Sequence, residues 1–216
     1  MNLYHNIIFR KILYYELYNL EVVTLIGALE NQNKKNINNC ILLGIPFIFI
    51  LACLFHFMYE ATGKTIVSAI FFPVNESIFE HLKLVLYPTI IYWIVLYLFI
   101  KGNYKIPFKK WLIGLCFSIV SSIVSILFFY YVFKSAFNIS SLFWHIIIVL
   151  ISAIIGQIIG LHVFNNIKYN SLKFLICLII IATLVIIFTK YTFFPPHLPL
   201  FYDFTKNIYG LMIILF

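Results

Sequence analysis

The amino-acid sequence predicts an all-α, polytopic membrane protein with five full membrane spans. Hydrophobic residues fill 63% of its 216 positions, and charged residues fill only 10%. The apolar residues come in unbroken runs, several of which approach or exceed the roughly 20 residues that cross a bilayer as a helix. A β-barrel would instead show alternating polar and apolar residues. The length suits one transmembrane domain and leaves little for a soluble one.

The amino-terminal part of the chain differs from the rest. We expect an extension over residues 1–39, followed by a single transmembrane helical domain over residues 40–216. Residues 1–20 mix aromatic and aliphatic side chains with charged ones, which is typical of an amphipathic helix lying at the membrane surface. The sequence NQNKKNINN, residues 31–39, is interpreted as a polar linker.

Five long apolar segments follow the extension in order. Gly63 is expected to end the first helix and Asn75 to cap the second. Between them, Ile66 to Phe72 is apolar but too short to cross the membrane, so we expect a re-entrant or interfacial segment. The predicted spans are about Cys40–Tyr59, Asn75–Ile100, Trp111–Phe133, Leu142–Phe164 and Leu172–Thr189.

The carboxy-terminal part begins with a segment that cannot be helical. Pro195, Pro196 and Pro199 fall within five positions, and proline breaks a helix. The final residues, 208–216, are apolar but few. We expect this short segment to be a half-span or an interfacial anchor.

Small residues recur every four positions in the third and fourth spans. Such stripes let neighbouring helices approach closely, so these two spans are expected to pack tightly against each other or against other spans. Gln157, in mid-span, is expected to form a hydrogen bond with another helix. The stripes consist of Gly114, Ser118 and Ser122 in one span, and Ser152, Gly156 and Gly160 in the next.

The net charge of +8 does not indicate nucleic-acid binding here. The basic residues lie in short loops between spans, where they attract anionic lipid and set orientation. Loops rich in lysine alternate with poorer ones, which places the amino terminus in the cytoplasm of a multi-pass cell-membrane protein. The four cysteines show no CxxC spacing, so free thiols are expected.

This topology brings distant polar residues to the same, outer side of the membrane. The segment PVNESIFEHLK, residues 73–83, the loop before His145 and the Pro-rich segment all emerge there. Polar and titratable groups beside a bilayer usually have a functional reason to be there. The converging residues are His56, Glu60, Glu76, Glu80, His81, Lys83, His145, His197 and Asp203.

Helical geometry suggests which of these residues face one another. If a helix runs through the whole segment, Glu76, Glu80, Lys83 and Tyr87 fall within about 60° of arc. His81 then points about 100° away from Glu80 and is expected to face something else. We therefore take Glu76, Glu80 and Lys83 as candidate catalytic groups.

Glutamate and histidine at helical spacing are also how metal sites form within helix bundles. The candidate ligands are His56, Glu60, Glu80, His197 and Asp203, and they would suit zinc, manganese or iron. A structural reading stands beside this one, because Glu80 and Lys83 could simply neutralise each other. A substrate or ion pathway is a third reading. His145 fits an interfacial histidine better than a ligand.

Three stretches together resemble an uncharacterised family of small integral membrane proteins from low-GC Gram-positive bacteria. They are HFMYEATG (56–63), PVNESIFEHLKLVLYP (73–88) and FFPPHLPLFYD (193–203). Within them lie the family's PVNESxxEHLK and PPHxPLFxD motifs. The family is a domain of unknown function, so the resemblance implies a membrane protein and supplies no mechanism.

Three functions are compatible with these observations. The first is a membrane-embedded, metal-dependent hydrolase that acts on a lipid or lipid-linked substrate from the outer face. The second is a small transporter that uses the same carboxylates for ion or proton coupling. The third is a non-catalytic membrane scaffold or partner-binding subunit. The expected partners are the bilayer and, given the chain's small size, a second copy of the chain.

Overall fold

In the part of the chain that the structure describes, five helices are long and apolar enough to cross a membrane, as predicted. The computed structural model describes residues 22, 24, 25, 27–137 and 142–211. The chain divides into two units, residues 1–40 and 41–216. The candidate spans are Gly27–Ala61, Ile78–Ile100, Phe108–Lys134, Phe143–Asn166 and Ser171–Phe193.

Of the two predictions made for the amino-terminal extension, the structure describes the residues of only one. The amphipathic helix predicted over residues 1–20 lies outside the described residues. The predicted polar linker at residues 31–39 is wrong, because these residues are helical. The stretch has no glycine or proline to break a helix, so its polarity alone did not make it a loop.

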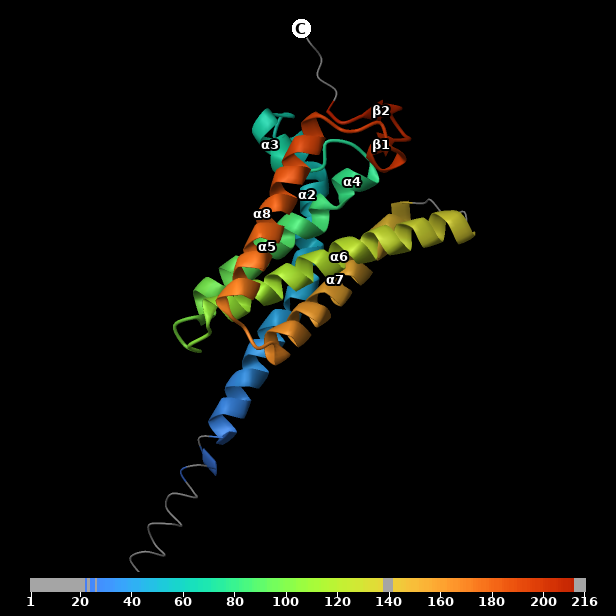
Figure 1. The fold of residues 1–216 in the computed structure, drawn as a ribbon. Coiled ribbons are helices and arrows are strands. Elements are labelled where there is room, and N and C mark those ends of the chain that lie inside the picture. Colours follow the sequence, from blue (N-terminus) through green and yellow to red (C-terminus); the bar gives the residue numbers. More distant parts are fainter. Residues whose placement is uncertain (1–21, 23, 26, 138–141, 212–216) are drawn as a thin grey trace, which may run out of the picture. The chain divides into compact units, whose positions relative to one another are not determined.

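The second unit is a bundle of long helices with short elements gathered at one end (Figure 1). Helix α4 leads into α5 through a single turn residue, Leu82. The long helices are α2 (Gly44–Ala61), α5 (Lys83–Ile100), α6 (Phe108–Phe137), α7 (Leu142–Asn166) and α8 (Ser171–Phe193). The short elements are α3 (Ile66–Phe71), α4 (Ile78–His81), η1 (Pro199–Phe201), β1 (Tyr202–Asp203) and β2 (Ile208–Tyr209).

Helices α6 and α7 form the most extensive pairing in the bundle, and their small-residue stripes face each other. Ser122 donates a hydrogen bond to the carbonyl of Ser152 at 3.0 Å. A Cβ atom added at Gly156 would lie 2.8 Å from the carbonyl oxygen of Ser118. The prediction that these two spans pack tightly against each other is therefore confirmed.

A buried hydrogen-bonded network ties α5 to this pair. The side-chain amide of Gln157 on α7 donates to the hydroxyl of Ser118 on α6 at 2.9 Å. Its carbonyl accepts from the indole N–H of Trp93 on α5 at 3.2 Å. The expected interhelical hydrogen bond of Gln157 is thus confirmed, and it satisfies polar groups that would otherwise be costly inside an apolar bundle.

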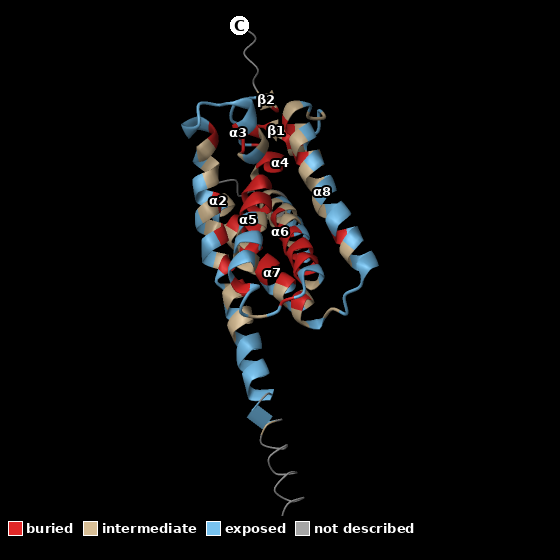
Figure 2. Cartoon of the chain, turned by 90° about the vertical axis from the view of Figure 1, so that its left-hand side faces the viewer, coloured by how far each residue is buried: buried red, intermediate tan, exposed pale blue. Residues whose placement is uncertain are grey.

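The outer surface of the bundle is apolar. Figure 2 shows that α8 is mostly exposed, whereas much of α5 and α6 is buried. Exposed side chains on α8 include Leu175, Ile179 and Ile186. A soluble protein would rarely expose so continuous an apolar face, and hydrocarbon is the environment that suits it.

The short elements at one end follow the predicted breaks. Gly63 has φ +78°, and its N–H bonds the carbonyl of Glu60, so it ends α2 as expected. Helix α8 stops at Phe193, before the prolines, and the chain continues through η1 into the β1–β2 hairpin. Tyr202 pairs with Tyr209 across this hairpin. Of the predicted short apolar segment, residues 212–216 lie beyond the described part.

Candidate functional site

Ser77, rather than Asn75, caps the helix that begins the second span. The Ser77 hydroxyl accepts a hydrogen bond from the N–H of Glu80, and α4 starts at Ile78. The Asn75 side chain instead accepts from the N–H of Ser77 and donates to the carbonyl of Gly210. Glu76 therefore precedes the helix. The predicted single stripe through Glu76 and Glu80 is wrong, and the two carboxylates face different partners.

Glu80 forms a buried ion pair with Lys83. Their charged atoms are 2.7 Å apart, and the side chains are only 2% and 0% exposed. The Lys83 ammonium also donates to the carbonyls of Ala69 and Phe72, at the end of α3. It therefore has a partner for each of its three protons.

The Glu80 carboxylate is equally well satisfied. One oxygen accepts from the N–H of Val74 as well as from Lys83, and the other accepts from the hydroxyl of Thr192 on α8. Neither Glu80 nor Lys83 lines the cavity described below. These contacts support the structural reading of the pair, because they join α3, the start of the second span and the end of α8.

Glu76 has a separate set of partners, which are histidines. Its carboxylate lies 3.3 Å from Nε2 of His81 on α4 and 3.9 Å from Nε2 of His56 on α2. One potential ligand atom from each of these three residues lies within 4.8 Å of the others. We call His56, Glu76 and His81 the His–Glu–His triad.

The three groups of the triad lie close enough together to hold a metal ion. Ligand atoms of a tetrahedral zinc site lie roughly 3.3 to 3.5 Å apart, because the bonds are about 2.0–2.1 Å long. One Glu76 oxygen lies 3.3 Å from Nε2 of His81, and the other Glu76 oxygen lies 3.9 Å from Nε2 of His56. The other ring nitrogen of His81, Nδ1, lies 2.9 Å from the carbonyl of Ser77, to which it must donate. Metal-bound histidines are commonly oriented in this way.

Asp203 holds the backbone of Glu76 in place. One Asp203 oxygen accepts from the N–H of Glu76 at 2.9 Å, across 127 residues of chain. The other oxygen accepts three hydrogen bonds from Thr205 and Lys206 within the hairpin turn. Asp203 is buried with both oxygens engaged, so it acts here as a positioning residue for Glu76.

These contacts also determine the charge of the two carboxylates, both of which lie outside the spans. The hydrogen bond from His81 lowers the pKa of Glu76, and this outweighs the opposite effect of burial. Burial alone would raise the pKa of Asp203, but the hydrogen bonds from Thr205, Glu76 and Lys206 bring it below its ordinary value. Both groups are therefore anionic at neutral pH.

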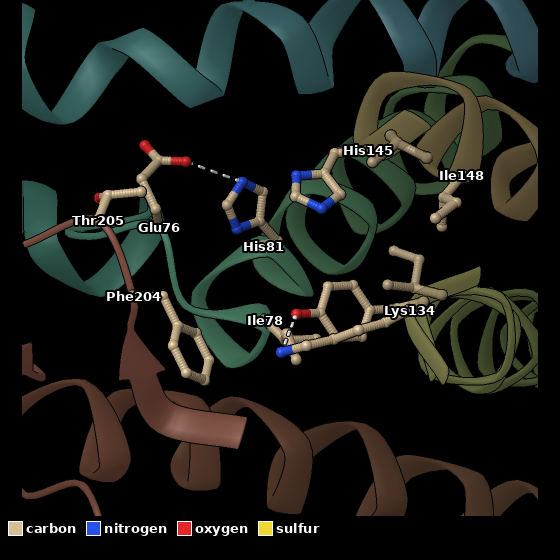
Figure 3. Close-up of a pocket in the computed structure, with 11 residues that line it drawn as sticks. Glu76, Ile78, His81, Lys134, His145, Ile148, Phe204 and Thr205 are labelled. Atoms are coloured by element: carbon tan, nitrogen blue, oxygen red, sulfur yellow. Dashed lines mark hydrogen bonds and ion pairs between the residues drawn. The ribbon is translucent and has the colours of Figure 1, made fainter. Parts of the chain in front are cut away.

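The triad borders a cavity of about 540 Å³, which we call the polar cavity (Figure 3). Glu76 and His81 lie on one side of it, and His145 from α7 lies beside His81, with ring centroids 6.1 Å apart. Lys134 of α6 lies opposite, where its ammonium donates to the Tyr130 hydroxyl at 3.3 Å. The lining residues are Glu76, Ile78, His81, Ile126, Tyr130, Lys134, His145, Ile148, Val149, Phe204 and Thr205.

The remaining predicted ligands lie in other surroundings. Glu60 is 69% exposed and forms an ion pair with Lys64 at 3.3 Å. His197 is exposed, and its ring packs against that of Tyr209 at 4.7 Å. Of the predicted site residues, the structure therefore brings His56 and Glu76 together. Glu60 and His197 do not belong to this group.

His81 and His145 were among the residues expected to converge at the outer side but were not chosen as ligands or catalytic groups, and Lys134 and Tyr130 were not candidates. His81 was assigned to another face because the helix was assumed to run from Asn75. The segment Ser77–Glu80 has the Ser-x-x-Glu pattern of a capping box, which marks a helix start and could have corrected this. Lys134, Tyr130 and His145 come from two other helices, and no local pattern relates them to Glu76.

The fold and the site together define a multi-pass helical membrane protein with a histidine- and carboxylate-lined cavity at one end of its bundle. The chain belongs to a family of unknown function, DUF6512, which it matches over residues 29–211. The three stretches that carry the resemblance noted above lie within this range. Neither the curated proteins nor the solved structures contain a match to the chain.

Proposed function

We propose that the protein binds a divalent metal ion through His56, Glu76 and His81 and acts as a membrane-embedded hydrolase. The observation that carries the proposal is the closeness of these three ligand groups at the edge of the polar cavity. Two histidines and one glutamate, with a coordination position left open, form a common catalytic zinc site. The same set also binds iron(II), and the proposal includes that ion.

The surrounding groups suit hydrolysis of an ester or phosphoester. A metal ion held by His56, Glu76 and His81 would supply an activated water for hydrolysis, in which the water oxygen bonds to carbon or phosphorus as the bond to the leaving oxygen breaks. The leaving oxygen needs a proton. His145, half-buried and next to His81, is in a position to transfer one. Lys134 faces the same cavity and can pair with a negative charge that develops on the substrate.

The metal content of purified protein tests the proposal. Wild-type protein should hold close to one equivalent of zinc or iron, measured by elemental analysis after loading and dialysis. His81→Gln, His56→Gln and Glu76→Gln should each lose most of it, because each removes a ligand. Metal-free wild type after loading would contradict the proposal.

Two matched variants distinguish this ligand set from the one predicted from sequence. His197→Gln removes an exposed histidine at the same end of the bundle, and Glu60→Gln removes an exposed glutamate near the end of α2. Both should keep wild-type metal content. If His197→Gln loses the metal while His81→Gln keeps it, the His–Glu–His triad is not the site.

The orientation in the membrane is part of the same proposal. Because loops rich in lysine alternate with poorer ones, we expect the amino terminus to be cytoplasmic, and the polar cavity would then open on the outer side. Support comes from the basic loops at the other end of the bundle, such as the α5–α6 connection with Lys101 and Lys105. The catalytic groups would then meet substrates from the outer leaflet or from outside the cell.

A further inference from the structure

We infer that the substrate is a lipid phosphate, with its head group in the polar cavity and its chain in an apolar groove between α2 and α7. The groove has a volume of about 150 Å³. This inference rests on the proposed function, because it names the substrate class of that site. It depends on the fact that the groove and the polar cavity share lining residues.

The groove is apolar and opens at the outside of the bundle. Its buried floor is formed by Ala52, Leu84 and Val149. Phe57 and Ile146 stand at its rim and are largely exposed on the faces of α2 and α7. An apolar space of about 150 Å³ holds a molecule the size of benzene, so the groove takes the first part of a chain. The rest of the chain would remain in the surrounding lipid.

The groove ends at the candidate catalytic groups. His56, His81 and His145 line it, and the last two also line the polar cavity. Val149 is likewise shared by the two spaces. A molecule that occupies both therefore has its apolar-to-polar junction beside the His–Glu–His triad, where the proposed hydrolysis takes place. An amphiphile has this division between chain and head.

The polar cavity offers a cation for the head group. Among the described residues, no carboxylate lies within ion-pair distance of Lys134. Its ammonium is held over the ring of Phe204 at 4.2 Å and bonded to Tyr130. Lys134, the Tyr130 hydroxyl and His145 together present donors to one space, and phosphate accepts several such bonds. A metal ion at the triad would offset the negative charge of Glu76 and strengthen the attraction.

The native thiol of Cys53 reports on occupancy of the groove. Cys53 is free, exposed and part of the groove lining. Purified protein in neutral detergent is treated with a thiol-reactive maleimide, and the modification of each cysteine is followed by peptide mass spectrometry. Phosphatidic acid should slow modification of Cys53 about tenfold, whereas inorganic phosphate and a neutral diacylglycerol should have little effect. The half-buried Cys40 is the internal control, and its rate should not change.

Two variants test the two halves of the site. Lys134→Ala should raise the concentration of phosphatidic acid needed for protection by about tenfold, as expected for the loss of a charge-assisted contact. Ile146→Trp should abolish protection by filling the groove. Ile158→Trp on the same helix, also exposed but outside the groove, should leave it unchanged. Equal protection by neutral lipid, or unchanged protection in both Lys134→Ala and Ile146→Trp, would overturn the inference.

Running the experiment on chelator-treated and metal-loaded protein distinguishes the two proposals. Protection without any metal binding would refute the proposed hydrolase and leave the lipid site standing. Metal binding at the triad without protection of Cys53 would refute the lipid site alone.

Discussion

At the scale of single residues, two glutamates four positions apart have different roles. Glu76 precedes helix α4, its side chain is partly exposed, and its partners are histidines. Glu80 lies inside the first turn, buried, with a lysine partner. A buried charge is tolerated only if it is paired and hydrogen-bonded, and Glu80 meets both conditions. Two glutamates within about one turn of each other thus differ in burial and in partners.

The buried pair makes a prediction about stability. Glu80→Gln should lower the free energy of unfolding by about 3–5 kcal/mol, because it leaves the Lys83 charge buried without its partner. Thermal or denaturant unfolding of the detergent-solubilised protein measures this. The matched control is Glu60→Gln, which breaks an exposed pair with Lys64 and should change stability by less than about 1 kcal/mol.

A further variant checks the cause of the loss. If the unpaired charge is responsible, Glu80→Gln combined with Lys83→Met should cost less than the two single changes added together. An additive result, or a Glu80→Gln protein as stable as the Glu60→Gln control, would show that the pair does not carry this energy.

At the scale of elements, the closely packed α6–α7 pair carries several of the residues that line the polar cavity. Lys134 and Tyr130 come from the end of α6, and His145 comes from the start of α7. The small-residue stripes let these helices approach closely, and these three side chains, which line the polar cavity, all lie on helices rather than on loops. Precise placement of catalytic groups favours such a support.

Adding a methyl group to this interface should therefore be costly. In Gly156→Ala the new carbon would lie 2.8 Å from the Ser118 carbonyl, so the helices must separate. We expect a loss of about 1–3 kcal/mol in unfolding free energy. Gly102→Ala is the control, because a Cβ there has nothing within 4 Å, and its stability should hardly change. Equal stability of the two variants would contradict the packing described here.

At the scale of the whole molecule, the apolar surface and the clustered polar groups lie in different parts of the structure. The described long helices expose apolar side chains to the side, whereas α3, α4 and the hairpin gather polar groups at one end (Figures 1 and 2). The connection between α7 and α8 lies at the opposite end, because both helices run the length of the bundle. The proposed orientation therefore assigns the two ends to opposite sides of the membrane.

Cysteine labelling in intact cells tests that orientation. Lys206→Cys, in the exposed turn of the hairpin, should react with a membrane-impermeant maleimide without permeabilisation. Lys168→Cys, in the exposed α7–α8 connection, should react only after permeabilisation, because the amino terminus is proposed to be cytoplasmic. The reverse pattern would place the polar cavity on the cytoplasmic side and overturn the assignment.

The sequence by itself determined the membrane class, the five spans, the tight packing of two of them and the end at which polar groups meet. Each of these follows from a local pattern that a bilayer imposes: unbroken apolar runs, small-residue stripes and prolines after the last span. Two of the three members of the His–Glu–His triad were also predicted, since Glu76 and His56 were both recognised as candidates.

Only the tertiary structure decided which of these polar groups face one another. The direction of Glu76 depends on a helix start capped by Ser77 and on a hydrogen bond from Asp203, far away in sequence. Lys83 donates a hydrogen bond to a carbonyl of α3, and the ring of His81 lies beside that of His56 from another span. Side-chain partners across helices depend on where each helix begins and how the backbones pack. A one-dimensional pattern does not contain that information, so the triad and the polar cavity appear only in three dimensions.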